Sequence, residues 1–267
     1  LGEIAKKYGL PVQSHMSESV NEIAWVAELH PECDTYAGVY EQYGLLHEKA
    51  YMAHCCHSSK EEREILRKTG ASAVHCASSN FMLSSRVMDV RQFLEEGIKV
   101  ALGTDVAGGY SPSMLDALRQ AVIASRVKGF EYKKMMKEQE QEREVVDSSR
   151  LSPSESGDDA SLSSVSSPST PSSSSSALVE KDYKSLNYVE AFHLATVGGA
   201  EVLGMGDVVG NFMVGKKLDC LIIDVHHEDS PIDIFEHESS SEHFQKFLFL
   251  GDDRNIAHVF VDGKCVI

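Results

Sequence analysis

Short apolar runs alternate with helical patterns along residues 1–127, and four of these runs end in a polar side chain. The runs are as short as buried strands usually are, and strands that alternate with helices indicate parallel β–α–β units. The polar residues at their ends are His15, His54, His75 and Asp105. Because parallel strands place their C-terminal ends at one edge of a sheet, where such folds carry their chemistry, we expect these side chains to gather there.

The segments between the apolar runs have the spacing of amphipathic helices. In the last of them, Met114, Leu118 and Ala121 recur on one helical face, and Ser111-Pro112 is a typical helix start. The helices that this spacing predicts cover residues 18–29, 60–68, 85–95 and 112–127. An α/β fold with a parallel sheet is therefore expected for the first 130 residues.

Residues 131–182 break this alternation. Lys133 to Glu144 is mostly charged, and serine makes up more than half of residues 148–176. A segment of this composition buries too little apolar surface to offset the entropy that is lost when it becomes ordered. We therefore predict a disordered, charged and Ser-rich insertion over residues 131–182, in which Lys133 to Glu144 is helical or frayed.

A regular pattern returns after the insertion. Tyr188 to Leu203 has helical spacing that ends at Gly204, and β-rich segments follow over residues 210–223 and 257–267. In the second of these segments, Asp262-Gly263 predicts a two-residue hairpin turn. The expected division of the chain is an α/β region at 1–130, the insertion at 131–182, a final helical region at 183–206 and a small β-domain at 207–267.

The composition narrows the classes of partner. The net charge is −16, from 41 acidic and 25 basic residues. This acidity argues against nucleic acid or an anionic membrane as a partner, because phosphate binding requires clustered Lys and Arg. No run reaches the ~20 apolar residues of a membrane span, and the six Cys form no CxxC pair. We expect a cytosolic enzyme with reduced thiols that acts on a small molecule.

The residues at the strand ends suggest a metal site. His15 and Asp105 are candidate ligands, because neutral imidazole and carboxylate suit Zn²⁺ or another first-row ion. Glu18 follows His15 by three residues and can face the same pocket without binding the metal, where it can move a proton from an attacking water to a leaving group. His54 is either a ligand or a hydrogen-bonding partner of that water. His75 is either a further site residue or a core residue that is hydrogen-bonded to the backbone.

Six longer stretches carry a family resemblance. They are Gln13 to Glu18, Met52 to Cys55, Val74 to Asn80, Leu102 to Ala117, Ser230 to Phe235 and Phe247 to Ile256. Together they resemble the amidohydrolase superfamily and, within it, the guanine deaminase family, to which the last two stretches are most specific. The resemblance implies a (β/α)₈ TIM-type barrel, of which this chain forms about strands 5–8, with a small β-domain. It also implies one Zn²⁺ per site, a homodimer, and the hydrolysis of guanine to xanthine and ammonia in purine catabolism.

The same resemblance implies a role for each site residue. His15 and Asp105 would be zinc ligands, and Glu18 would be the proton shuttle. His54 would orient or polarise the attacking water, and Asp105 would also help to deprotonate it. The residues that it implies in substrate binding are His15, Met16, Ser17, Glu18 and Asp105.

The chain departs from the family pattern in one respect. Family members carry a His-x-His pair of zinc ligands on their first barrel strand, and this sequence has no His-x-His. The chain also opens at Leu1 to Tyr8, which resembles the second half of a helix. We therefore expect the C-terminal portion of a longer enzyme. Two further hypotheses are a related amidohydrolase that acts on another aminated heterocycle, and a scaffold protein that kept the fold and lost the metal.

Overall fold

The computed structural model describes residues 1–150 and 183–267. These residues divide into two compact units, unit 1 over residues 1–128 and 185–267 and unit 2 over residues 129–184. Most of the predicted Ser-rich insertion, residues 151–182, lies outside the described residues.

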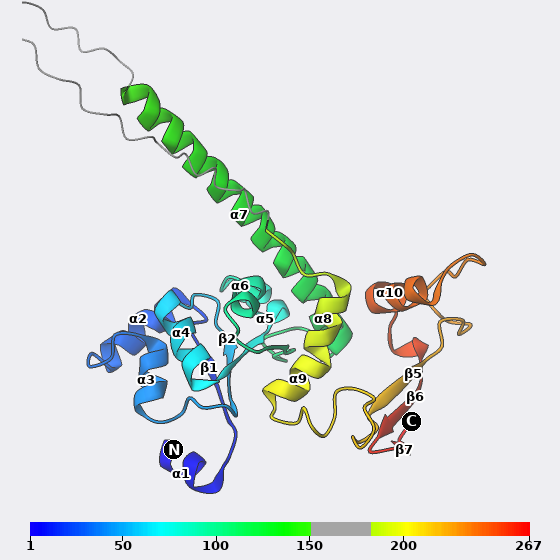
Figure 1. Cartoon of the computed structure of the whole chain (residues 1–267). Helices are drawn as coiled ribbons and strands as arrows, with labels where there is room; N and C mark the ends of the chain where they lie inside the picture. The colour runs from blue at the N-terminus through cyan, green and yellow to red at the C-terminus, as the bar shows by residue number, and fades with distance from the viewer. Residues whose placement is uncertain (151–182) are drawn as a thin grey trace, which may run out of the picture. The chain divides into compact units, whose positions relative to one another are not determined.

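Unit 1 is built around a sheet of four parallel strands in chain order (Figure 1). The strands are β1 (Val12–Met16), β2 (Ala50–His54), β3 (Ser72–His75) and β4 (Val100–Leu102). Each lies in one of the four apolar runs, and every neighbouring pair is parallel. The predicted α/β fold with a parallel sheet is therefore confirmed, and the C-terminal ends of all four strands share one edge.

Six short helices precede or connect these strands. They are α1 (Gly2–Tyr8), α2 (Val20–Leu29), α3 (Tyr36–Gln42), α4 (Lys60–Thr69), α5 (Ala77–Met82) and α6 (Val90–Glu95). Helices α2 and α4 match their predicted ranges, and each begins with a capping box, Ser19 with Glu22 and Ser59 with Glu62. The helix expected over residues 85–95 begins later, because Asp89 caps the first turn through the backbone N–H of Gln92. The spacing analysis missed α3 and α5, which are only seven and six residues long.

The core of unit 1 lies between the sheet and these helices. Leu66 on α4 is fully buried in the same cluster as Met52 of β2 and Phe93 of α6. This burial explains why the apolar face of α4 faces the sheet although most of its residues are charged.

We expect Leu66→Ala to lower the free energy of unfolding by about 2–5 kcal/mol, because it leaves a cavity in a packed core. Urea denaturation of the complete gene product that contains this chain measures the change. Leu203→Ala is the matched control, since Leu203 is largely exposed. Equal effects of the two substitutions would contradict the assigned core.

Two helices stand where one was expected after the insertion. Helix α8 (Tyr188–Ala195) ends at Thr196, whose backbone leaves the helical region, and α9 (Val197–Val202) follows directly. Both pack beside β4. A Cβ on Gly198 would lie 3.0 Å from the carbonyl oxygen of Val100, so the glycine permits a close approach to the strand. The prediction of one continuous helix to Leu203 is therefore wrong at this break.

The C-terminal region contains a three-stranded antiparallel sheet and a helix. The strands are β5 (Cys220–Ile223), β6 (Ile256–Val261) and β7 (Lys264–Cys265). Asp262 and Gly263 both have positive φ, so the predicted hairpin turn is confirmed. Only the end of the β-rich segment 210–223 forms a strand. Helix α10 (Ser240–Leu250) and the 3₁₀ turn η1 (Asp253–Asn255) were not predicted.

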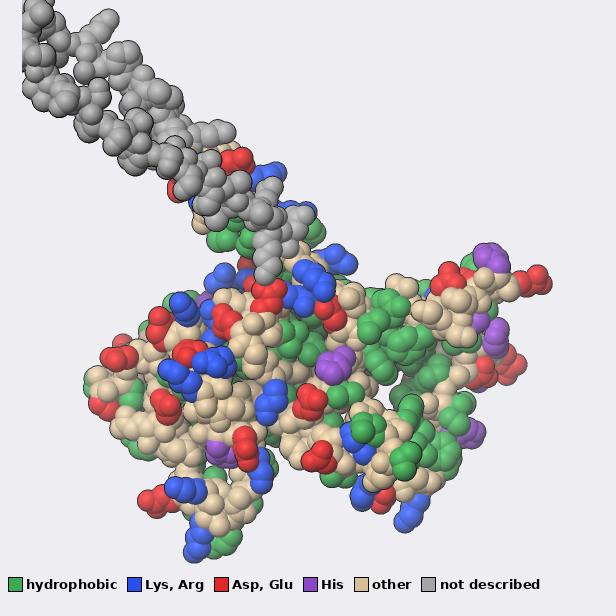
Figure 2. Space-filling model, in the orientation of Figure 1, with side chains coloured by type: hydrophobic (Ala, Val, Ile, Leu, Met, Phe, Trp, Pro, Cys, Tyr) green, Lys and Arg blue, Asp and Glu red, His purple; other side chains and the backbone are tan. Residues whose placement is uncertain are grey.

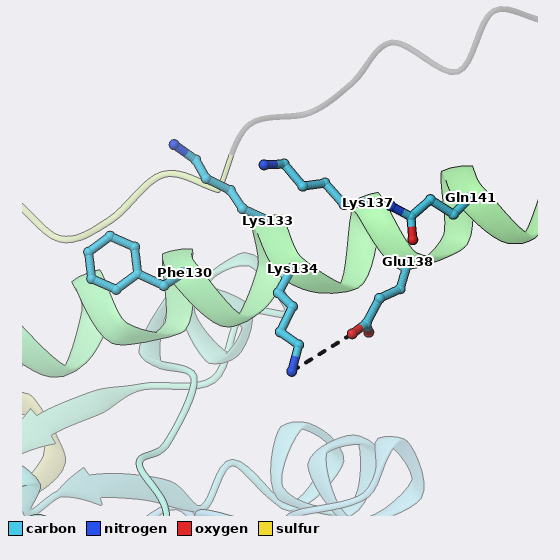
Figure 3. A pocket seen from close by; sticks show the side chains of 6 residues that line it. All are labelled: Phe130, Lys133, Lys134, Lys137, Glu138 and Gln141. Carbon is cyan, nitrogen blue, oxygen red and sulfur yellow. Dashed lines mark ion pairs between the residues drawn. The ribbon is translucent and has the colours of Figure 1, made fainter.

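Helix α7 (Met114–Arg150) is much longer than the helix predicted over residues 112–127. Its second half occupies residues 131–150 at the start of the predicted insertion, so the expectation that Lys133 to Glu144 is helical is confirmed, whereas a disordered segment does not begin at residue 131. The physical reason is local, since this stretch is rich in helix-forming Lys, Glu, Gln and Met, and Lys134 pairs with Glu138 one turn later. A shallow pocket on this part of α7 is lined by Phe130, three lysines, Glu138 and Gln141, none of which belongs to the predicted site (Figure 3).

Charged side chains of both signs are interspersed over unit 1 on the face that Figure 2 shows. Within the described part of the chain, no helix combines the length and the apolar character that crossing a membrane would require. That nucleic acid and membranes are not partners stays a prediction from composition.

Candidate metal centre

Three of the predicted strand-end residues meet at the C-terminal edge of the parallel sheet. His15 lies near the end of β1, His54 ends β2, and Asp105 follows β4 by three residues. One ligand atom of each lies within 4.8 Å of the others. In a tetrahedral zinc site with bonds of about 2.0–2.2 Å, ligand atoms are roughly 3.5 Å apart. Small side-chain rotations would therefore bring these donors to a single cation.

The backbone is unusual at the same edge. Ser17, His54 and Asp105 adopt left-handed conformations with φ values of 49°, 71° and 47°. His54 pairs in register with Met16, whose side chain points into the core, yet the His54 ring stacks on the ring of His15 at 5.1 Å. Residues held in sparsely populated conformations cluster at functional sites, so this backbone supports the assignment of a site here.

His54 is the buried centre of the cluster. Its Nδ1 lies 3.7 Å from Oε1 of Glu18, and its Nε2 lies 3.9 Å from Oδ2 of Asp105. Burial is the main influence and lowers the pKa of His54, whereas the two carboxylates act in the opposite direction. The imidazole is therefore neutral at physiological pH, the form in which a histidine binds a metal or accepts a hydrogen bond.

Glu18 lies beside the three candidate ligands without joining them. Its carboxylate is partly exposed and accepts a hydrogen bond of 3.2 Å from the hydroxyl of Ser85. A carboxylate that is anchored on one side and open on the other can exchange protons with a substrate. That Glu18 serves the reaction without binding the metal stays a prediction.

The sequence pattern of the amidohydrolase family matches residues 1–140 and 158–266 of this chain. The chain belongs to the amidohydrolase family. Over the whole length of this chain the identity to mouse guanine deaminase is 40%, and over 99% of this chain the identity to the guanine deaminase of Dictyostelium discoideum is 35%. The chain covers 49% and 48% of these proteins, so it spans about half the length of the curated relatives it matches.

Solved structures give the same relationship. The guanine deaminase of C. acetobutylicum, crystallised with bound guanine in its active site, superposes on this amidohydrolase with a TM-score of 0.74. The two are 32% identical, and the alignment covers all of this chain and 51% of the other. An adenosine deaminase from Xanthomonas campestris with bound zinc has a TM-score of 0.68 at 19% identity, which shows a shared fold alone.

The structure of this amidohydrolase does not bring every predicted substrate-binding side chain into the cluster. Met16 is fully buried in the core, and the buried hydroxyl of Ser17 donates a hydrogen bond of 3.0 Å to Glu62. The side chains of His15, Glu18 and Asp105 do face the site. The side chains of Met16 and Ser17 are therefore engaged in the core and with Glu62, and their part in substrate binding stays a prediction.

Two residues, Asn80 and Ser85, contact the cluster although the sequence analysis gave them no role. Asn80 on α5 is buried, and its amide nitrogen lies 3.1 Å from Nδ1 of His54 and 3.1 Å from Oγ of Ser85. Asn80 belongs to one of the stretches that carry the family resemblance. Neither residue ends a predicted strand, which is why the pattern of strand ends did not reveal them.

His75 ends β3 and is buried, but its surroundings differ from the prediction. Both ring nitrogens lack a hydrogen-bond partner among the described residues, so the expectation that a backbone group satisfies them is wrong. Burial, assisted by nearby His54, lowers the pKa of His75 to about 4.

We expect His75 to make the protein less stable as the pH falls from about 6.5 to about 4. The unfolded chain takes up a proton near the ordinary pKa of 6.5, whereas the folded protein holds the ring neutral to about 4, so the unfolded state binds more protons within this window. Urea denaturation at several pH values measures the slope. His75→Leu should flatten the slope in this window, and an unchanged slope would contradict the prediction.

Proposed function

We propose that this chain carries part of the active site of a zinc-dependent guanine deaminase, which hydrolyses guanine to xanthine and ammonia. The observation that carries the proposal is the convergence of His15, His54 and Asp105 beside Glu18 in a chain similar to guanine deaminases along its whole length. The four parallel strands would form about strands 5–8 of a (β/α)₈ barrel, with the antiparallel sheet as a small β-domain.

The residues of the cluster fit a zinc ion. His15 and Asp105 offer a nitrogen and a carboxylate oxygen, which are donors that zinc prefers. They would hold the ion, and any further ligands would lie outside this chain. When bound, zinc supplies Lewis acidity that makes a water molecule nucleophilic near neutral pH.

The other side chains would handle the protons of the reaction. Water adds to the ring carbon that bears the amino group, and Asp105 and Glu18 are placed to take a proton from that water. Glu18 would pass that proton to the ring nitrogen and would then carry the proton of the newly added hydroxyl to the amino group, so that a carbonyl forms as the carbon–nitrogen bond breaks and ammonia departs. His54 lies between the two carboxylates and would orient the attacking water.

Assays of the complete gene product test this proposal. We expect guanine to be converted to xanthine with one ammonia released per turnover, and one zinc per active site. Turnover of adenosine, cytosine or a chlorinated triazine with guanine inert would indicate a related amidohydrolase instead. A protein that binds no zinc and transforms none of these substrates would support the scaffold hypothesis.

The proposal extends to location and assembly. All six cysteines are free in the structure, as expected of a protein from a reducing compartment. The enzyme would work in the cytosol, with guanine as its small-molecule substrate and a homodimer as its assembly.

A further inference from the structure

A directional chain of hydrogen bonds reaches His54 from the side opposite Asp105. The amide nitrogen of Asn80 lies 3.1 Å from Nδ1 of His54, and both side chains are almost completely buried. An amide nitrogen can only donate, so Nδ1 must be the acceptor. A neutral imidazole that accepts through one nitrogen carries its proton on the other, which here is Nε2.

Ser85 determines which way the amide of Asn80 points. Its hydroxyl donates its single proton to the carboxylate of Glu18, which accepts only, and this leaves lone pairs for Asn80. The amide must then present its nitrogen to Ser85 as well as to His54. The carbonyl oxygen of Asn80 has no hydrogen-bond partner among the described residues, so nothing there favours the reversed amide.

The tautomer decides between the two interpretations of His54. Nε2 faces Asp105 at 3.9 Å, and a protonated Nε2 has no lone pair to offer a cation. His54 then donates a hydrogen bond toward the oxygen atoms of the site, and the metal-binding side chains of this chain reduce to His15 and Asp105.

We propose that Asn80, oriented by Ser85, is a positioning residue that holds His54 in the tautomer protonated on Nε2, and thereby makes His54 a hydrogen-bond donor. The catalytic consequence rests on the proposed function. The tautomer itself does not, because it follows from the contacts of Asn80 and Ser85 alone.

The direct test is ¹⁵N NMR of the complete gene product, labelled on histidine and freed of metal. We expect the unmodified protein to show His54 with a bare Nδ1 and a protonated Nε2, and His54→Gln identifies its signals. A protonated Nδ1 in the unmodified protein would overturn the proposal, and this measurement requires no folded variant of Asn80.

Asn80→Asp provides the second arm of the test. The carboxylate is nearly isosteric but can only accept, so it should draw the proton of His54 to Nδ1. We expect the ¹⁵N spectrum to show a protonated Nδ1 and a bare Nε2 for His54. We also expect kcat to fall by about 10²–10⁴-fold with a smaller change in KM, as for a misoriented catalytic imidazole. Asn255→Asp is the control, because Asn255 is equally buried but hydrogen-bonds to Asp224 and Ser230 instead. An Asn80→Asp protein that keeps the original tautomer would contradict the proposal.

Two substitutions of Ser85 test whether its hydroxyl orients the side-chain amide of Asn80. Ser85→Thr keeps the hydroxyl and should keep the tautomer, whereas Ser85→Ala should leave a mixture of both tautomers. Equal spectra for the two variants would remove Ser85 from the proposal. If the tautomer is as proposed but guanine is inert, the proposed function fails alone, and if guanine is deaminated with Nδ1 protonated, this inference fails alone.

Discussion

Glu18→Gln is expected to lower the turnover of guanine by about 10²–10⁴-fold while zinc stays bound, because general acid–base steps contribute a factor of that size. Glutamine keeps the shape of the side chain and an oxygen that can accept the hydrogen bond from Ser85. It cannot take up the proton of the attacking water, and it cannot deliver protons to the ring nitrogen and the departing amino group. The chemical step therefore loses its shuttle, although the surroundings of the site are preserved.

Two measurements separate this role from metal binding. Steady-state kinetics on guanine give the loss in kcat, and elemental analysis of the same preparation gives the zinc content. Glu28→Gln on α2 is the matched control, since Glu28 is exposed. A variant with near-normal kcat would remove Glu18 from the mechanism, and a variant that loses zinc together with activity would make Glu18 a ligand.

The sequence predicted the sheet better than it predicted the site. Strands β2, β3 and β4 are mostly buried, whereas the edge strand β1 alternates between half-buried and exposed residues, and short runs separated by helical patterns were enough to locate all four. The convergence of His15 and Asp105 followed from that topology, because both lie at C-terminal strand ends. Short helices such as α3 and α5 were missed, since six or seven residues do not establish a helical period.

What the sequence could not predict depends on single backbone angles and on contacts between distant residues. The left-handed φ of His54 interrupts the alternation of side-chain directions along β2. No residue pattern in the sequence predicts a left-handed conformation at a histidine. The contact of Asn80 with His54 joins residues 26 apart in the chain. The helical alternative for Lys133 to Glu144 is confirmed, but the sequence did not show that this stretch continues the preceding helix without a break.

The structure also explains why Asp105 can approach its partners so closely. A Cβ on Gly108 would lie 2.7 Å from Oδ2 of Asp105 and 2.8 Å from the hydroxyl of Ser79. Both distances are far too short for a side chain, so the glycine leaves the space in which the carboxylate lies. The glycines that follow Asp105 in the sequence therefore contribute directly to the shape of the site.

Asp105→Ala is expected to have the largest effect of any single substitution in the site. It removes one of the two proposed zinc ligands of this chain and, at the same time, a carboxylate that is placed to deprotonate the attacking water. We expect the zinc content to fall well below one per site and turnover to fall by about 10⁴-fold, the upper end of the range for an acid–base group, because both roles are lost together.

Titration with zinc separates the two roles of Asp105. Asp105→Asn keeps an oxygen donor without its charge, so it should bind zinc more weakly than the unmodified protein but more tightly than Asp105→Ala, and it should regain little activity at saturating zinc. Asp207→Ala is the control, since this aspartate is exposed and lies outside the cluster. Full zinc occupancy in Asp105→Ala would exclude Asp105 as a ligand. Full activity of Asp105→Asn at saturating zinc would show that its charge takes no part in proton transfer.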